Sequence, residues 1–277
     1  MERLETVRRL IVNADDFGLS SSANRAIVRA HCEGILTTAS LMVNEPGFDE
    51  ALALARENPN LGVGLHLTLS HGHSALPAKE IPGLVNECGE FSNDPTATGF
   101  RYFMRRELRD PLRREIFAQF EKFRATGLPL DHLNGHLHFH LHPTVFRIVM
   151  DAAEKFGVRR MRLTRDPFWL NVRLDSGRWL YRGSHAFIYG CLSRKARGAL
   201  RRRGIRHTRK VFGLLQNALV DEDYILKLLP RLPAGDSELY SHPSLDDFKH
   251  EFAALLSERV KASIRDNRIE LIRYQDL

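Results

Sequence analysis

Leu-Ile-Val-Asn-Ala-Asp-Asp-Phe-Gly, residues 10–18, is a mostly apolar run that ends in two adjacent acids and a glycine. The apolar part at 10–14 is typical of a short β-strand. The three serines at 20–22 then offer N-caps, which predict a helix over 23–33. A buried strand that leads directly into a capped helix is the first unit of an α/β fold, and its acids lie where the strand ends.

The same alternation continues to the end of the chain. Apolar runs and helical periodicities predict further strands at 39–43, 61–69, 131–139, 159–164, 211–215, 238–241 and 269–273, and helices at 48–57, 105–126, 144–156, 222–229 and 245–257. Residues 70–100 are rich in Gly, Pro, Ser and Asn and predict a long loop. Seven or eight βα units in 277 residues indicate a barrel with a mostly parallel sheet. No Pro- or Gly-rich linker divides the chain, so we expect one domain over 1–277.

Composition limits the class of protein. Hydrophobic residues make up 43% of the chain and charged residues 27%, as in an ordinary soluble globular protein. No apolar stretch approaches the roughly 18 residues of a membrane-spanning helix, and the charged residues 1–5 do not resemble a signal peptide, so we expect a cytoplasmic protein. Cys32, Cys88 and Cys191 lie far apart, which favours neither a thiolate zinc site nor a disulfide framework.

Charge is distributed unevenly along the chain, whose formal net charge is +7. No Asp or Glu lies between Asp175 and Asp221, and the Lys and Arg residues in this interval are interleaved with aromatic ones. We interpret residues 176–210 as an irregular or helical insertion. A solvated basic helix with core-facing aromatics has this pattern, and so does a segment that contacts an anionic membrane through residues 178–210. We expect no nucleic-acid partner.

Side chains that suit chemistry recur where the predicted strands end. The residues concerned are Asp15, Asp16, His66, His136, His138, His140 and His242. In a parallel barrel these strand ends share one rim, where active sites are assembled. One carboxylate with two imidazoles suits a divalent metal that keeps open positions, and a second carboxylate could accept a proton from water. Each motif also has a structural interpretation: an Asx turn for the acids and a buried core position for a histidine.

Four of these segments, in register, resemble the YdjC-type carbohydrate deacetylases. They are Val-Asn-Ala-Asp-Asp-Phe-Gly-Leu-Ser at 12–20, Gly-Leu-His-Leu at 64–67, Asn-Gly-His-Leu-His-Phe-His at 134–140 and Ser-His-Pro at 241–243. The resemblance covers about residues 8–275. It implies a distorted TIM-like (β/α) barrel, related in architecture to polysaccharide deacetylases. It also implies a hydrolase that removes the N-acetyl group from N-acetylglucosamine units, for example in chitooligosaccharides.

The resemblance further implies a role for each site residue. Asp16, His66 and His136 would bind one divalent metal ion, with Mg, Zn, Mn and Ni not distinguished. Asp15 would be the general base, and His242 would lie in the active site as the general acid.

Asn134 stands where many members of that family carry Asp. The Asn form, with the His-Phe-His-Leu-His-Pro run at 138–143, is similar to the hopanoid-biosynthesis branch, which implies an N-acetylglucosaminyl hopanoid lipid as substrate and contact with the inner face of the membrane. His138 and His140 are predicted to share the strand face of His136 and to contact substrate or support a ligand. Arg162, late in the next strand, could orient a carboxylate or bind substrate.

Other interpretations of the residues remain open. A phosphoesterase uses a similar Asp/His set but usually needs two metals bridged by carboxylates. A glycosidase needs two carboxylates across the sugar. A non-catalytic metal- or nucleic-acid-binding protein would depend on the basic segment. The sequence leaves open the choice between a lipid-linked and a soluble sugar, and whether the chain forms a homo-oligomer.

Overall fold

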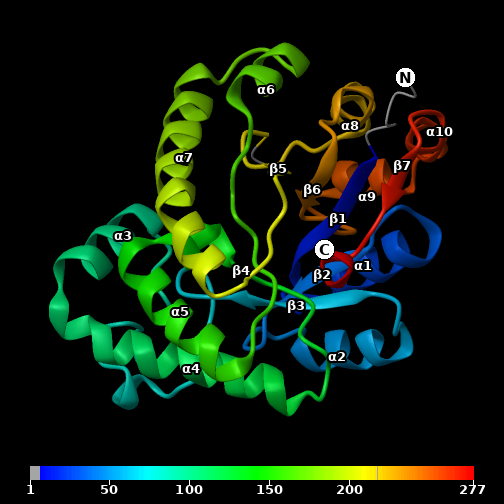
Figure 1. Ribbon diagram of the computed structural model, residues 1–277. Helices are drawn as coiled ribbons and strands as arrows, with labels where there is room; N and C mark the ends of the chain where they lie inside the picture. Colours follow the sequence, from blue (N-terminus) through cyan, green and yellow to red (C-terminus); the bar gives the residue numbers. More distant parts are fainter. Residues whose placement is uncertain (1–6, 217) are drawn as a thin grey trace.

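A computed structural model describes residues 7–216 and 218–277, so the predicted absence of a signal peptide at 1–5 falls outside the described residues. Seven strands form one sheet in the order β4-β3-β2-β1-β6-β5, with β7 beside β1, and every pairing is parallel (Figure 1). The strands are β1 Arg8–Phe17, β2 Thr38–Leu41, β3 Gly62–Leu67, β4 Leu133–Gly135, β5 Lys210–Phe212, β6 Gly235–Ser241 and β7 Ile269–Leu271. The predicted α/β class with parallel strands is confirmed.

Helices cover the outside of this sheet (Figure 1). They are α1 Ser21–Glu33, α2 Phe48–Glu57, α3 Pro95–Met104, α4 Arg109–Ala125, α5 Pro143–Phe156, α6 Phe168–Leu174, α7 Trp179–Arg202, α8 Glu222–Leu228, α9 Lys249–Leu256 and α10 Glu258–Asp266. The predicted cap at the start of α1 forms, because the Ser20 hydroxyl accepts from the backbone N–H of Ala23 at 3.2 Å. Strands β2 and β3 are buried at every residue, including the polar Thr38, Ser40 and His66.

The sheet curls into a half-barrel whose edges, β4 and β5, are joined by an irregular segment. Residues 159–165 lie between them in place of the predicted strand at 159–164. Single backbone hydrogen bonds hold the segment: Leu133 N–H donates to Arg160 O at 3.0 Å, and Val211 N–H donates to Arg165 O at 3.2 Å. Isolated bridges therefore replace a regular ladder, so the barrel is distorted as the family resemblance implied.

The predicted strand at 131–139 ends much earlier, at Gly135. Residues His136–Leu141 form 3₁₀ turns, and Leu137 and His138 have positive φ angles of 50° and 58°. Two consecutive left-handed residues cannot continue a β-strand, so the alternation of histidines predicted for this strand is wrong.

Three helices were missed by the sequence analysis: α3, α6 and α10. Helix α3 begins inside the predicted loop at 70–100 and continues to Met104, and its N-cap Asp94 followed by Pro95 is a helix-start signal hidden in the loop composition. Helix α6 precedes the basic insertion, and α10 follows α9 after the N-cap Ser257.

The basic insertion at 176–210 is mostly helical, as α7. No helix in the described ranges is both long and apolar enough to cross a bilayer.

Candidate metal and catalytic site

The two acids of the first motif reach the same site because β1 contains a bulge. The register of β1 against β2 shifts between Ala14 and Phe17, and Asp16 has a φ of 65°. On a regular strand, adjacent residues point to opposite faces of the sheet. The extra left-handed residue cancels that alternation and brings both carboxylates to the carboxyl end of the strand. Strained backbone of this kind is concentrated at functional sites.

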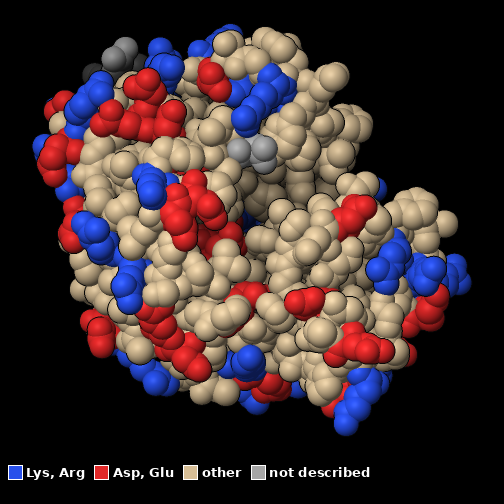
Figure 2. Space-filling view, turned by 180° about the vertical axis from the view of Figure 1, so that it is seen from behind, with Lys and Arg blue, Asp and Glu red and all other residues tan. Residues whose placement is uncertain are grey.

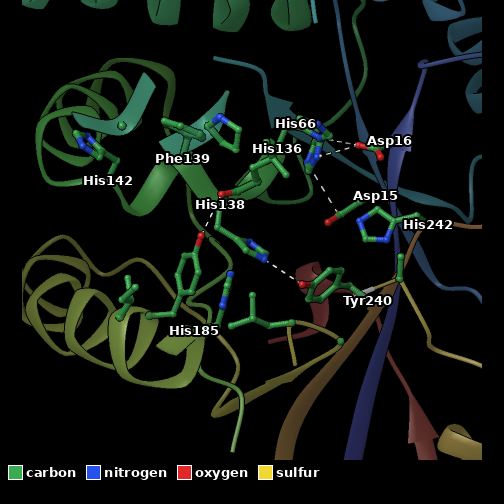
Figure 3. A pocket seen from close by; sticks show the side chains of 18 of the residues that line it. Asp15, Asp16, His66, His136, His138, Phe139, His142, His185, Tyr240 and His242 are labelled. Atoms are coloured by element: carbon green, nitrogen blue, oxygen red, sulfur yellow. Dashed lines mark hydrogen bonds and ion pairs between the residues drawn. The ribbon is translucent and has the colours of Figure 1, made fainter. Parts of the chain in front are cut away.

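Asp16, His66 and His136 converge on one point (Figure 3). Their potential ligand atoms lie within 4.8 Å of one another. Asp16 Oδ1 is 3.3 Å from His66 Nε2 and 3.0 Å from His136 Nδ1. These three residues come from β1, β3 and the turn after β4, which are separate in sequence. One carboxylate and two imidazoles at this spacing form a possible binding site for a divalent metal.

The orientation of His66 fits a cation. His66 Nδ1 lies 2.7 Å from the amide oxygen of Asn134, which only accepts, so Nδ1 carries the proton. In the neutral ring, Nε2 then presents its lone pair to the Asp16 carboxylate. Two acceptors that face each other are satisfied by a metal ion between them, and a partner on the second ring nitrogen is the usual way in which a metal-binding histidine is oriented.

Asp16 and His136 shift each other's pKa values in opposite directions. Burial opposes ionisation of Asp16, but His136 outweighs it and holds the pKa of that carboxyl well below its usual range. Burial likewise opposes the charge on His136, and Asp16 nevertheless raises its pKa. Metal ligands must be deprotonated, so a metal would compete with a proton on His136 and should bind more weakly as the pH falls.

Asp15 lies deeper than Asp16 and is held by donors on one side. Arg162 binds it bidentately, with Nη1 2.6 Å from Oδ2 and Nη2 3.0 Å from Oδ1. Asn13 and Asn134 also donate to Oδ1, at 2.9 and 3.0 Å. Burial would raise the pKa of Asp15, but Arg162 and then His66 outweigh it and hold that pKa far below its usual range. The carboxylate is therefore ionised, and Oδ2 has only one protein donor.

His242 follows β6 and lies beside Asp15, close to the metal ligands (Figure 3). Its backbone N–H donates to Glu251 Oε2 at 2.6 Å, and its Nδ1 is 3.7 Å from the same oxygen. Burial would lower the pKa of His242, but Glu251, Asp16 and Asp15 together raise it to about 9. In the metal-free protein this imidazole is thus positively charged at neutral pH and can donate a proton.

These groups open into a pocket of about 560 Å³. Besides the five residues at its polar end, the pocket is lined mainly by apolar and aromatic side chains: Phe139, Tyr181, Ile188, Tyr189, Leu192, Leu214, Tyr240 and Phe248. Helix α7 forms one wall and helix α3 contributes Thr96 and Gly99. A polar reacting end beside an apolar wall is the usual composition of a small-molecule site.

The other predicted site residues have different surroundings. His138 lines the pocket and lies between the Tyr240 hydroxyl, at 3.0 Å from Nε2, and the Thr164 hydroxyl, at 3.3 Å from Nδ1. His140 and Arg162 are fully buried and do not line it. His140 Nε2–H donates to the Arg162 carbonyl at 3.1 Å. Direct substrate contact, as predicted for His140 and Arg162, does not fit this geometry, whereas orienting a carboxylate, the alternative role for Arg162, does.

Sequence reasoning missed several residues that shape the site. Tyr240 precedes the Ser-His-Pro motif by one residue, and its ring lies 4.3 Å from the guanidinium carbon of Arg162. Glu251, which faces His242, belongs to α9 and carried no signal of its own. Asn134 was noted only as a departure from the family, but it joins His66 to Asp15 through one amide.

Comparisons with known proteins find a family model and several curated relatives. The family model described as YdjC-like protein matches residues 9–266. A carbohydrate deacetylase of Brevibacillus brevis is 41% identical over 150 residues, which are 54% of this chain and 57% of that protein. A carbohydrate deacetylase of Geobacillus stearothermophilus is 41% identical over 57% of this chain and 62% of its own length. The chitooligosaccharide deacetylase of Serratia marcescens is 37% identical, over 57% and 60%. Each match thus spans under two thirds of the relative.

Solved structures share the fold at low identity. A crystal structure of a protein from Enterococcus faecalis superposes with a TM-score of 0.72 over 98% of both chains, at 23% identity. The lactam utilization protein from Thermus thermophilus gives a TM-score of 0.50 over 95% of this chain and 98% of its own, at 17% identity. At such identities the likeness concerns the arrangement of strands and helices alone.

Proposed function

Since this chain belongs to the YdjC-like protein family, we propose that it is a metal-dependent hydrolase that removes the N-acetyl group from an N-acetylglucosamine unit. One observation carries the proposal: the Asp16, His66 and His136 cluster shares the polar end of one pocket with a second carboxylate, Asp15, and a cationic imidazole, His242. The relatives named carbohydrate and chitooligosaccharide deacetylases support the substrate class.

Amide hydrolysis needs an activated water, a stabilised oxyanion and a proton for the departing nitrogen. A divalent metal bound by Asp16, His66 and His136 would polarise the acetyl carbonyl and lower the pKa of water. The protein would supply the base that takes the proton from that water and the acid that protonates the departing nitrogen. Asp15 on β1 and His242 after β6 lie beside the cluster, so a substrate amide placed there is within reach of both a base and an acid (Figure 3).

Asp15 is suited to accept the proton from the attacking water. Its Oδ2 has a single protein donor, Arg162 Nη1, and so keeps a free lone pair toward the pocket. Arg162 fixes the plane of the carboxylate and keeps it ionised, at the cost of making it a weaker base. A positioned base of this kind contributes about 10²–10⁴-fold to the rate.

His242 is suited to give a proton to the sugar nitrogen as the C–N bond breaks. Glu251 holds the backbone N–H of His242 and lies 3.7 Å from its Nδ1, and together with Asp16 and Asp15 it helps to keep the ring protonated. A metal ion in the cluster would act in the opposite direction and lower the pKa of His242, toward the range in which a general acid works best.

We propose further that the sugar is lipid-linked, as in the N-acetylglucosaminyl hopanoid of the family branch that this sequence resembles. The support comes from α7. Tyr189 and Leu192 line the pocket, Ile188 lines it and is 50% exposed, and Phe187, next in sequence, is 73% exposed. The apolar wall of the pocket therefore continues onto the surface, which suits an apolar group attached to the sugar.

The same surface suits contact with an anionic membrane. Five large apolar side chains of α6 and α7 are exposed: Trp169, Trp179, Leu180, Phe187 and Ile188. The segment between Asp175 and Asp221 contains Lys and Arg residues but no Asp or Glu. By contrast, basic and acidic residues are mixed over the face of the molecule shown in Figure 2. Aromatic and aliphatic side chains among cations are the composition of interfacial helices.

Acetate release by the metal-loaded protein tests the activity. We would compare N-acetylglucosaminyl hopanoid with N,N′-diacetylchitobiose, each with and without a chelator. Chelator-sensitive release from the lipid alone supports the whole proposal. Release from chitobiose alone supports the deacetylase and contradicts the lipid assignment. Release of free sugar or phosphate in place of acetate would indicate a glycosidase or a phosphoesterase.

Vesicle sedimentation tests the membrane contact separately. The double variant L180S/F187S should lose most of its binding to vesicles of anionic phospholipid, because it removes two exposed apolar anchors. The control is Val7→Ser, which makes the same kind of change at a residue 58% exposed at the amino end of β1, the opposite end of the barrel. Equal binding by the wild type and both variants would contradict contact through α7.

A further inference from the structure

A fully buried layer of polar side chains lies beneath the metal ligands. It includes Asn13 on β1, Ser40 on β2, Asn134 on β4 and His132 just before β4. We propose that Ser40, backed by His132 and Asp131, is a positioning residue that fixes the amide of Asn134 and thereby the metal-binding orientation of His66. The inference rests on the metal site of the proposed function.

The direction of each hydrogen bond in the layer follows from counting donors and acceptors. Ser40 Oγ lies 3.0 Å from Asn13 Nδ2 and 2.8 Å from Asn134 Nδ2, and both amides donate. A hydroxyl has two lone pairs, so these are filled and its proton must point elsewhere. Two acceptors lie within reach of it, His132 Nε2 at 3.0 Å and Asn13 Oδ1 at 3.4 Å, and the nearer one, His132 Nε2, accepts the proton.

The far end of the chain of bonds fixes the tautomer of His132. Asp131 Oδ2 is 2.9 Å from His132 Nδ1 and can only accept, so Nδ1 carries the ring proton and Nε2 stays free for Ser40. The ring itself cannot turn, because it stacks on Tyr274 with a centroid distance of 4.3 Å. Gly64 admits it: a Cβ there would lie 2.5 Å from the His132 ring.

At the other end of this series of hydrogen bonds, Asn134 connects Ser40 to the metal site. Asn134 Nδ2 is held by two acceptors, Ser40 Oγ and Asp15 Oδ1, at 2.8 and 3.0 Å. Its Oδ1 must then face His66 Nδ1, which donates at 2.7 Å and leaves Nε2 for the metal. Ser40 is therefore the second of two anchors that keep the amide from rotating.

Asp131, His132 and Ser40 follow the order of a serine-hydrolase triad, but their setting excludes that chemistry. Ser40 and His132 are 0% exposed and neither lines the pocket. Both lone pairs of the hydroxyl are occupied by amides, so no acyl group can reach it. The role left to this trio is orientation.

A double-mutant cycle on Zn²⁺ affinity tests the proposal without relying on activity. Asn134→Ala should weaken Zn²⁺ binding by about 10–100-fold, as for other partners of metal-binding histidines. Ser40→Ala, one bond further away, should weaken it by about 3–10-fold. If Ser40 acts through Asn134, its effect should vanish in the Asn134→Ala background. Affinity would be measured by competition with a chromophoric chelator.

Ser237→Ala is the matched control. Ser237 is a buried serine on β6 whose hydroxyl has no hydrogen-bond partner in the structure. It should leave Zn²⁺ affinity unchanged. Should Ser40→Ala fail to fold, Ser40→Cys keeps the volume and replaces the hydroxyl with a weak donor and acceptor. An effect of Ser40→Ala that persists in full without Asn134, or equals that of Ser237→Ala, would overturn the inference.

Nitrogen NMR of the histidine rings gives a second readout. In the metal-free wild type, His66 should be protonated at Nδ1, and Ser40→Ala should raise the fraction protonated at Nε2. A wild type that binds Zn²⁺ and shows this coupling but releases no acetate would contradict the proposed function alone. Normal acetate release with no coupling would contradict this inference alone.

Discussion

At the scale of single residues, the site depends on one unusual backbone angle. Asp16 adopts a left-handed conformation with φ 65° inside the bulge of β1. A non-glycine residue there costs of the order of 1–3 kcal/mol. Because of this conformation, two residues adjacent in sequence have different partners: Asp16 faces the histidine ligands, and Asp15 faces Arg162.

Exchanging each acid for its amide should separate the two roles. Asp15→Asn should lower kcat by about 10²–10⁴-fold, because the proton acceptor is lost, and should weaken Zn²⁺ binding less than Asp16→Asn does, because its amide oxygen can still accept from Asn134. Asp16→Asn should weaken Zn²⁺ binding as well, because it removes the one anionic ligand. Chelator competition and acetate release on the same preparations check both expectations. Undiminished turnover by Asp15→Asn would remove it as the base.

At the scale of elements, the turn after β4 shows how a short segment serves both site and core. The 3₁₀ turns His136–Leu141 present His136 to the metal cluster and His138 to the pocket, and they bury His140 behind both. Burial and the nearby Arg162 lower the pKa of His140 to about 3. Its Nδ1 is buried and has no hydrogen-bond partner among the described residues, which fits an unprotonated nitrogen.

This neutral histidine should make the protein sensitive to acid. The unfolded chain binds a proton at His140 near pH 6.5, whereas the folded protein does so only near pH 3. The stability it contributes is therefore complete above about pH 6.5 and is lost as the pH falls toward 3. Urea unfolding of His140→Gln, which keeps a donor for the Arg162 carbonyl, should show a shallower loss between pH 6.5 and 4 than the wild type.

The control for this measurement is His250→Gln, a change at an exposed histidine, which should follow the wild-type curve. Identical slopes for His140→Gln and the wild type would contradict a neutral buried His140.

At the scale of the whole molecule, Arg162 connects the irregular side of the barrel to its centre. The residue lies in the segment 159–165 and is 0% exposed. It bonds Asp15 on β1, and its Nε and Nη2 donate to Glu238 Oε1 on β6 at 2.8 and 2.7 Å. Tyr274, near the carboxyl end of the chain, donates to the other oxygen of Glu238. One guanidinium thus ties three parts of the fold together beneath the site.

Arg162→Leu should consequently destabilise the protein by about 3–5 kcal/mol, because it leaves two buried carboxylates without their cation. Denaturant unfolding would measure the change. Arg159→Leu, at an exposed position of the same segment, should stay within about 0.5 kcal/mol of the wild type. A loss for Arg162→Leu no larger than that of Arg159→Leu would show that the buried charges are compensated elsewhere.

Local patterns in the sequence determined the fold class and the residue types at the candidate site. Apolar runs followed by capped helices predicted most of the parallel strands, and the acids and histidines at strand ends predicted a site at one rim, where the structure brings Asp16, His66 and His136 together as a possible metal-binding group. These inferences succeed because period and capping are local properties, and because parallel strands bring their carboxyl ends to one rim by geometry alone.

Only the tertiary structure decided the bulge at Asp16, the turns at 136–141, the broken edge at 159–165 and the wall formed by α7. It also joined Ser40, Asn134 and His66 into one chain of hydrogen bonds. Each of these depends on which groups meet across the barrel, where buried polar atoms must find partners. No pattern within a single segment contains that information, since the partners lie tens of residues apart.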